Sequence, residues 1–503
     1  MFDKKLDHER VKQIHQDRTE VEVQEVVQNA KAKGLSTTLN EYVPSEALPW
    51  NKKRVSHALR RMKFGSHFSD YESILLQTPA QFVDTTIDDA VNAALPVAPE
   101  WENKTPPPWG APDEDVLTYF EENFSLYIEY QTEWTDIMKE HPFREKMVLF
   151  WHNHFVTEIG KYELAPYAYR HFTLLRTFAL GNFRDFVRAI GKDHAMLIYL
   201  DGVENRVGSP NENYGRELLE LFTMGIGNYT QNDIEEISRA LTGFWVNYFT
   251  LEAGFSNALH DSGEKTFFEQ TGNFGYDDVI DIIFQERASE IATFICAKLY
   301  KFFVYETPNE AIVSELAQLF IDSDFEIEPV LRKLLKSEHF FDEEFNGAMI
   351  KSPIDLMLGM QKETGADVVG GLREWQPYQL LDLGQFLFNP VNVAGWPGYR
   401  AWISTTTLPH RWQYSLINIY DDVVDPIAIA NGMSAPNDPN QLALDLADYM
   451  LAVQLPQQEL DQLQTVLLGG IPDYEWSVNL PGANWRILNL MGHIRQLPEY
   501  QLH

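Results

Sequence analysis

The fold class is decided by residues 209–229, which read SPNENYGRELLELFTMGIGNY. Ser209 and Glu212 have the spacing of a capping box, with Pro210 at the first helical position. Gly225 supplies a stop signal near the other end. These start and stop signals predict one helix across this segment.

On an ideal helix the segment has an apolar face and a polar face. The apolar face holds Tyr214, Leu218, Leu221 and Phe222. Asn213, Glu217 and Glu220 share another face within roughly 60° of arc, flanked by Arg216. We expect the apolar side to be buried, so the question for function is what the polar side meets.

Helical periodicity extends over most of the chain, and we predict an all-α protein with many helices. The exception is a small β-hairpin insertion around residues 243–270, where aromatic and β-branched residues alternate. We predict an N-terminal arm at residues 1–49, a helical domain at 50–412 and an acidic helical region at 413–503 packed on it.

Composition restricts the class of partner. The chain has 503 residues and a net charge of -34, which disfavours nucleic acid and anionic membranes as partners. Its one cysteine, Cys296, excludes an internal disulfide and a cysteine-based zinc site. The first residues lack the apolar region of a signal peptide, and no window approaches ~18 uncharged apolar residues. We therefore expect no membrane span and a cytoplasmic location.

His152 and His154 form the first group that could carry chemistry. On an ideal helix they point about 160° apart, so they share a metal only if the helix distorts or ends there. In an extended segment they would converge. One interpretation makes them metal ligands; the other makes them a core histidine with a polar neighbour.

Two acidic groups could complete such a site. Carboxylates spaced like Glu217 and Glu220 occur in helical metal sites, but they also form salt-bridged stripes, for which Arg216 and Arg239 are available. His260 and Asp261 lie in a segment typical of turns. They are either a second ligand pair or a turn that Asp261 closes.

A loop rich in glycine, proline and tryptophan follows residue 384. Gln385, Asn392, Trp396 and Trp402 supply amides and large rings, which is how sugar-like ligands are held. The same residues could instead close the end of a helical core.

Six blocks of sequence resemble a known family. They read VSHALRRMKFG, FWHNHF, PNENYGRELLELFTMGIGNYT with TGFW, HDSGEK, KSPIDL and GQFLFNPVNVAGWPGYRAWI. In this order they are similar to the bacterial domain of unknown function 1800 family. The resemblance implies a mostly helical domain and no particular reaction. It also implies a sulfatase-like protein, encoded by a neighbouring gene, as a partner, and relatives that often look exported.

These observations lead to two hypotheses about function. The first is a metal-assisted hydrolase with zinc, iron or manganese, which uses bound water as the nucleophile. Its metal ligands would be His152, His154, His260, Glu217 and Asp261. Glu220 would be the general base and Arg216 an anion clamp. Substrate contacts would come from Asn213, Gln385, Asn392, Trp396 and Trp402.

The second hypothesis is a binding or assembly module without catalysis. Here the same histidines, carboxylates and amides form a buried hydrogen-bonded network, and the Trp396 loop recognises a glycan or a partner protein.

Overall fold

Helices make up most of the molecule. The computed structural model describes residues 38–366, 371–420 and 424–503, and this part is mostly helical (59%), with 22 helices and two small two-stranded antiparallel sheets. The predicted all-α class with a small β insertion is confirmed. Most of the predicted N-terminal arm, residues 1–37, lies outside the described residues.

The elements have the following bounds. The first half of the chain contains α2 (Lys52–Met62), α3 (Asp70–Leu75), α4 (Pro79–Asn92), α5 (Asp113–Glu140), α6 (Pro142–His154), α7 (Ile159–Tyr162), α8 (Ala165–Phe178), α9 (Phe183–Ile190), α10 (His194–Tyr199), α11 (Asn213–Glu217) and α12 (Gln231–Ala240). The strands are β1 (Phe244–Asn247), β2 (Glu252–Phe255), β3 (Lys265–Phe267) and β4 (Gln270–Gly272). The second half contains α13 (Tyr276–Glu286), α14 (Ala288–Phe303), α15 (Glu310–Asp322), α16 (Ile327–Leu335), α17 (Pro353–Thr364), α18 (Gly371–Asp382), α19 (Thr407–Tyr420), α20 (Pro426–Asn431), α21 (Pro439–Met450), α22 (Gln457–Leu468) and α23 (Ala483–Gln496).

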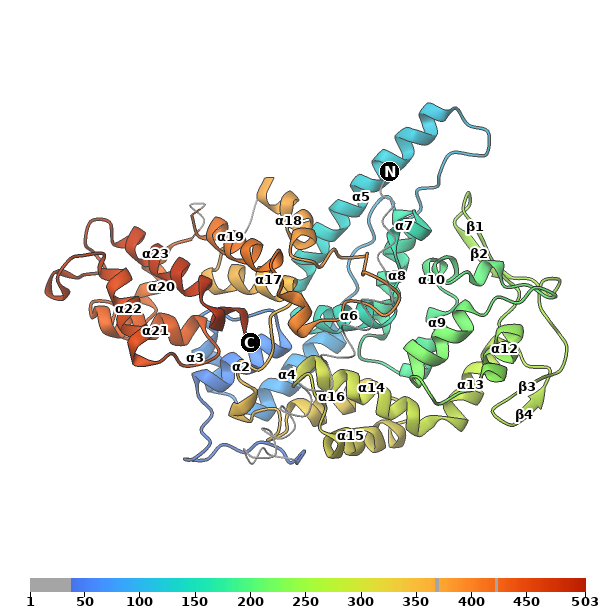
Figure 1. Ribbon diagram of the computed structural model, residues 1–503, viewed down its shortest axis with the longest axis horizontal. Helices are drawn as coiled ribbons and strands as arrows, with labels where there is room; N and C mark the ends of the chain where they lie inside the picture. Colours follow the sequence, from blue (N-terminus) through green and yellow to red (C-terminus); the bar gives the residue numbers. More distant parts are fainter. Residues whose placement is uncertain (1–37, 367–370, 421–423) are drawn as a thin grey trace.

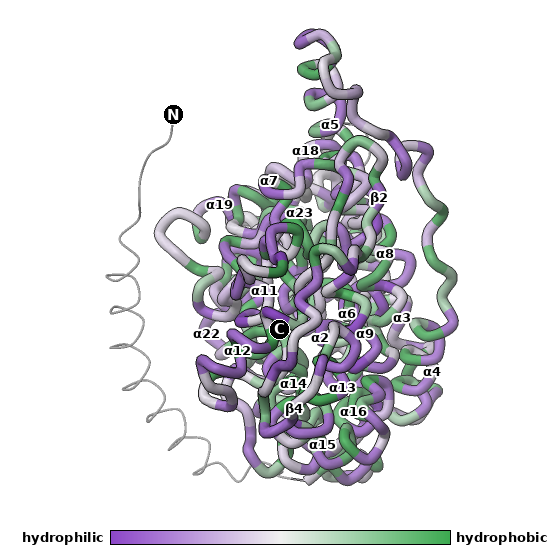
Figure 2. The backbone as a smooth tube through the Cα atoms, turned by 90° about the vertical axis from the view of Figure 1, so that its right-hand side faces the viewer, coloured by the Kyte–Doolittle hydropathy of each residue, from purple (hydrophilic) through white to green (hydrophobic). Residues whose placement is uncertain are grey.

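The molecule is elongated, with the C-terminal helices α20 to α23 at one end and the strands at the other (Figure 1). Helix α6 lies near the middle, and α14 to α16 run beneath it in this view. The N-terminal part of α5 extends away from the body, which the side view also shows (Figure 2). Leu117 on this part is 62% exposed. Within the described chain, no helix is both long and apolar enough to cross a bilayer.

The β insertion consists of two separate hairpins. Strands β1 and β2 pair antiparallel, with Phe244 opposite Phe255 and Asn247 opposite Glu252. Strands β3 and β4 pair in the same sense, with Lys265 opposite Gly272. Each sheet has only two strands, so the hairpins need the helices against which they pack. Helix α12 lies against β3, and α10 lies against β1.

Helix α6 is buried on nearly every side, including its charged first turns. Glu145 is completely buried, and its carboxylate accepts hydrogen bonds from Arg144 Nε at 2.9 Å, Arg176 Nε at 3.0 Å and Trp134 Nε1 at 2.7 Å. These bonds satisfy a charge that would otherwise be costly in the interior. The network joins α6 to α5 and α8 and fixes the central helix of the protein.

The C-terminal region is held to the body by buried polar contacts. Arg411 Nε donates to Gln501 Oε1 at 2.7 Å, and Arg60 donates to the carbonyl oxygen of Tyr449 at 2.8 Å. Ile350 and Leu502 form a short β-bridge. Helix α19 runs through residue 412, where the sequence predicted a domain boundary. The division into regions stays a prediction.

Candidate functional site

Within residues 209–229 the helix begins later than predicted. Helix α11 begins at Asn213, and its N-cap residue Glu212 makes no side-chain cap hydrogen bond. The predicted capping box is therefore wrong. The reason is local: the Ser209 N–H donates to the carbonyl oxygen of Arg206, so this residue closes a turn before the helix begins. Gly225 has a φ of +78°, and this left-handed conformation confirms the predicted stop signal.

The same helix then widens into a π-helical segment, Leu218–Thr223. Such segments shift the carbonyl groups out of the usual hydrogen-bond pattern. Two carbonyl oxygens here accept hydrogen bonds from other helices: Phe222 O accepts from His154 Nε2 at 3.0 Å, and Leu221 O from Lys298 Nζ at 3.5 Å. The π segment thereby connects to α6 and α14.

These contacts fix the protonation of His154. Its Nε2–H donates to the Phe222 carbonyl, so Nδ1 carries a lone pair and accepts a hydrogen bond from Lys298 Nζ at 2.9 Å. Burial and the nearby Lys298 charge hold the pKa of His154 well below its usual value. Burial and the neighbouring Lys301 lower the pKa of Lys298 to about 8. The pair therefore consists of a neutral imidazole and an amine that loses its proton unusually easily.

Asn153, between the two histidines, attaches the Trp396 loop to α6. Its Oδ1 accepts from the Trp396 N–H at 2.7 Å, and its Nδ2 donates to the Trp396 carbonyl oxygen at 3.2 Å. The loop approaches so closely that a Cβ added at Gly395 would lie 2.3 Å from Asn153 Oδ1. Gly395 also has a φ of +86°, so both the space and the backbone conformation require glycine.

A cavity of about 320 Å³ opens between α6, α14, α17 and this loop. Its aromatic lining residues are Phe150, Phe302, Trp396, Tyr399 and Trp402. Its polar lining residues are Lys146, Asn153, His154, Lys298, Lys301, Glu306, Ser352, Asp355, Gln385 and His503. We call this space the Trp396 pocket. Its size and its mixture of rings with a few polar groups are typical of small-molecule sites.

The Trp396 pocket carries more positive than negative charge. Lys146 forms a buried ion pair with Asp355, and Lys301 pairs with Glu306 at 3.5 Å. Among the described residues, Lys298 has no carboxylate partner. Behind the wall, the guanidinium of Arg61 is buried and acts electrostatically on Asp355, which also raises the local positive potential. This excess stands out in a chain with a net charge of -34.

Four of the residues predicted from the sequence meet in the Trp396 pocket. They are His154, Gln385, Trp396 and Trp402. Gln385 is buried, and its Oε1 accepts from the Ile354 N–H at 3.0 Å. Asn392 is exposed, is absent from the lining and instead accepts a hydrogen bond from the Ala394 N–H through Oδ1 at 2.9 Å.

The other predicted metal ligands do not line this pocket, although the ring of His152 packs against Trp396 with 5.2 Å between the ring centroids. His152 accepts a hydrogen bond from the Phe388 N–H at 3.1 Å, and burial keeps its pKa well below the usual value. His260 Nδ1 lies 2.9 Å from the Thr242 carbonyl oxygen. Asp261 accepts from the Gly263 N–H at 2.8 Å, which confirms the predicted turn, and it pairs with Arg239 at 2.8 Å.

The polar residues on the face predicted to be functional, Asn213, Glu217 and Glu220 with Arg216 beside them, contact residues outside the Trp396 pocket. Asn213 Nδ2 donates to Asp201 Oδ2 at 3.0 Å, and Arg216 pairs with Glu212 at 2.9 Å. Glu220 accepts from the Tyr229 hydroxyl at 2.6 Å. Burial, and then the charge of Glu220, raise the pKa of Glu217. None of these residues lines the Trp396 pocket.

A shared metal centre finds no support in this arrangement. Across residues 38–366, 371–420 and 424–503, no group of three or more His, Cys, Asp or Glu side chains has a geometry that could hold a metal ion. His154 and His260 each have a ring nitrogen against a main-chain carbonyl oxygen. The metal set stays a prediction from the sequence.

Sequence reasoning missed the two lysines and the amide that shape the pocket. Lys146 and Lys298 lie inside ordinary helical periodicity, where charged residues are expected to face solvent, so no pattern distinguishes them. Asn153 and Asp355 lie within the blocks FWHNHF and KSPIDL, and those blocks were the one available signal.

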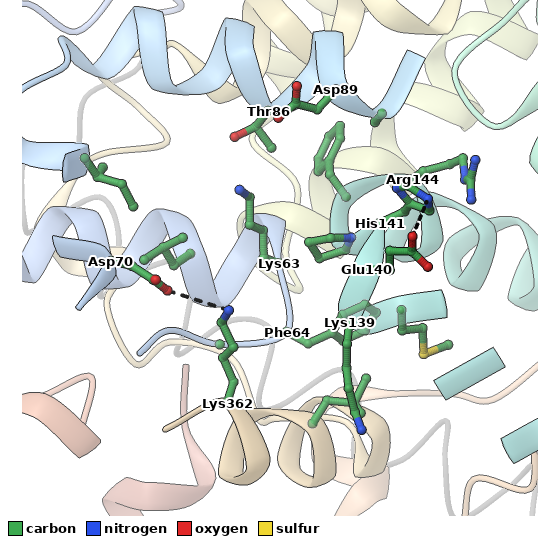
Figure 3. A pocket seen from close by; sticks show the side chains of 18 of the residues that line it. Lys63, Phe64, Asp70, Thr86, Asp89, Lys139, Glu140, His141, Arg144 and Lys362 are labelled. Carbon is green, nitrogen blue, oxygen red and sulfur yellow. Dashed lines mark ion pairs between the residues drawn. The ribbon is translucent and has the colours of Figure 1, made fainter. Parts of the chain in front are cut away.

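A second cavity, of about 380 Å³, lies between α2, α4 and the start of α6 (Figure 3). Lys63 points into it, Lys362 pairs with Asp70 at 3.8 Å, and His141 lies 3.8 Å from Glu140. Four cationic side chains (Lys63, Lys139, Arg144 and Lys362) and three carboxylates (Asp70, Asp89 and Glu140) line it, and none of the predicted site residues does. The Trp396 pocket is therefore the stronger candidate.

Comparison with known proteins gives one match. A family model described as "Protein of unknown function (DUF1800)" matches residues 57–502, which include the C-terminal helices. No curated protein and no solved structure matches the chain.

Proposed function

The chain belongs to the DUF1800 family, and from its Trp396 pocket we propose that it binds a small anionic carbohydrate. The single observation that carries this proposal is that Trp396 and Trp402 share one cavity with Lys298. Ring faces and edges contact the apolar side of a sugar, while a lysine without a carboxylate partner attracts a negative group.

Hydrogen bonds hold the loop that carries the rings in one position, which favours binding. Asn153 holds the main chain of Trp396 on both sides, and Gly395 allows the close approach. Trp402 is nearly buried, and its carbonyl oxygen accepts from the Thr407 hydroxyl at 2.9 Å. A ligand therefore meets rings that are already in place, and less conformational entropy is lost on binding.

The charge of the pocket supports an anionic ligand over a neutral or cationic one. Lys146 and Lys301 each form an ion pair with a carboxylate, whereas the charge of Lys298 is not paired with a carboxylate among the described residues and can attract an anionic ligand. Its ammonium donates to an imidazole nitrogen and to a distant carbonyl oxygen, and neither of these neutralises its charge.

Isothermal titration calorimetry with two matched glycosides tests the proposal. Methyl β-D-glucuronide and methyl β-D-glucoside share a ring and differ in the charge at one carbon, so we expect the glucuronide to bind more tightly. Trp402→Ala should weaken glucuronide binding roughly fivefold, since one aromatic contact is worth about 1 kcal/mol. Trp109→Ala is the matched control, because Trp109 is 90% exposed and does not line the pocket.

Equal binding of the two glycosides would contradict the role of charge. Failure of both to bind would contradict the proposal as a whole. The metal-assisted hydrolase stays a separate prediction, which elemental analysis of the untagged protein addresses directly.

A further inference from the structure

The side-chain amine of Lys298 is oriented by two protein acceptors and has one direction free for a ligand. Its Nζ donates to His154 Nδ1 at 2.9 Å and lies 3.5 Å from the Leu221 carbonyl oxygen. The third hydrogen position of Nζ has no acceptor among the described residues, and the side chain lines the Trp396 pocket. The two protein acceptors therefore orient the amine and leave one direction open for a ligand.

We propose that Lys298 is the reactive amine of this pocket and forms an imine with the carbonyl carbon of a small anionic aldehyde, the open-chain form of an acidic sugar included. The proposal rests on the proposed function, because it assigns a reactive group to the ligand of the same pocket.

The chemistry needs no other reagent. The Nζ lone pair attacks the carbonyl carbon, a C–N bond forms and the C=O bond opens to a carbinolamine. The carbinolamine then loses its hydroxyl group and the remaining Nζ proton as water, which leaves a C=N bond. No oxidation or reduction takes place, and water is the one product released.

The surroundings favour the neutral amine that this step requires. Among the described residues no carboxylate pairs with Lys298 Nζ to hold it in the charged form, and its two contacts are an imidazole nitrogen and a carbonyl oxygen. His154 is a positioning residue, since its Nδ1 lone pair holds one N–H of the amine. The other charged groups around the pocket are Lys146, Lys301, Glu306 and Asp355, and each lysine in this set has a carboxylate partner.

Lys301 provides an internal control for the experiment. It lies one turn along α14 from Lys298 and lines the same pocket, but it pairs with Glu306 at 3.5 Å. The full-length protein is treated with glyoxylate, a small anionic aldehyde, and sodium cyanoborohydride, which reduces an imine to a stable carboxymethyl-lysine. Peptide mass spectrometry then compares the rates of modification at the two lysines.

We expect modification at Lys298 to be faster than at Lys301 on the order of tenfold, because Glu306 pairs with the Lys301 ammonium, whereas Lys298 Nζ has no carboxylate partner among the described residues and one direction open to the pocket. Methyl β-D-glucuronide, which has no free carbonyl, should bind and protect Lys298. The Lys298→Arg variant should lose this modification, whereas the Lys301→Arg variant should still be modified at Lys298.

The outcomes separate the two proposals. Glycoside binding with equal modification of the two lysines overturns the imine and leaves the proposed function intact. Selective modification of Lys298 without glycoside binding supports the reactive amine and overturns the proposal that the pocket binds a carbohydrate. Neither binding nor selective modification overturns both. The wild-type ratio decides the matter even if the Lys298 variant does not fold.

Discussion

The buried carboxylate of Glu145 gives the sharpest test of how the fold is held together. Two guanidinium groups and one indole N–H donate to it at distances of 2.7–3.0 Å, and its side chain is fully buried. In Glu145→Ala, Arg144 and Arg176 lose their common counter-charge inside the protein. Breaking a buried ion pair in this way costs about 3–5 kcal/mol.

The control is an ion pair of similar length on the surface. Lys104 and Glu122 approach to 2.6 Å, but their side chains are 34% and 56% exposed. Glu122→Ala should therefore cost at most about 1 kcal/mol, because water screens the pair and solvates the remaining lysine.

Urea unfolding followed by circular dichroism measures both variants against the wild type. We expect a much lower midpoint for Glu145→Ala and an almost unchanged midpoint for Glu122→Ala, with similar slopes. A loss below about 1 kcal/mol for Glu145→Ala would refute the reasoning, because the two arginines would then have found other partners or water.

Three further predictions concern the loop, a buried histidine and an amide. Gly395→Ala should lower stability and glycoside affinity more than Gly110→Ala. Both glycines have a φ of +86°, but a Cβ added at Gly395 would lie 2.3 Å from Asn153 Oδ1, whereas one added at Gly110 would have no atom within 4 Å; thermal unfolding and calorimetry compare the two variants. Burial, and then Arg61, lower the pKa of His57 to about 3. The unfolded chain therefore binds a proton below pH about 6.5 that the folded protein excludes, and stability present above that pH falls by about 2 kcal/mol at pH 5. His57→Gln should remove this part of the pH dependence in urea unfolding at pH 7 and pH 5, and an unchanged dependence would contradict it. Asn392→Ala should change glucuronide affinity by less than about twofold, since its side chain closes a turn outside the pocket; a large loss would place it in the site.

Regular patterns in the sequence predicted the fold class well. Helical periodicity and the break around residues 243–270 appear in the structure as helices and hairpins, because burial of one helix face dominates the folding of such segments. Periodicity assumes that charged residues face solvent, and α6 violates this. Arg144, Glu145 and Lys146 are buried because each finds a partner from another part of the chain: the Ala93 and Ala94 carbonyl oxygens, Arg176 and Asp355, respectively. Long-range pairing of this kind leaves no local signal.

The candidate site was predictable only in part. The ring-rich loop identified Trp396 and Trp402, and both line the pocket. The helical spacing correctly implied that His152 and His154 point in different directions. Lys298 could not be found, because its role depends on a π-helical segment that turns the Leu221 and Phe222 carbonyl groups toward it and His154.

Residues from the blocks FWHNHF, KSPIDL and GQFLFNPVNVAGWPGYRAWI line the Trp396 pocket together with Lys298, and we propose that this pocket holds a ligand. The most direct measurement is a crystal structure of the protein soaked with methyl β-D-glucuronide. We expect the sugar ring to lie against Trp396 and Trp402, with its carboxylate toward Lys298. Density for the sugar in the cavity around Lys63, or an occupied Trp396 pocket with the carboxylate directed away from Lys298, would contradict it.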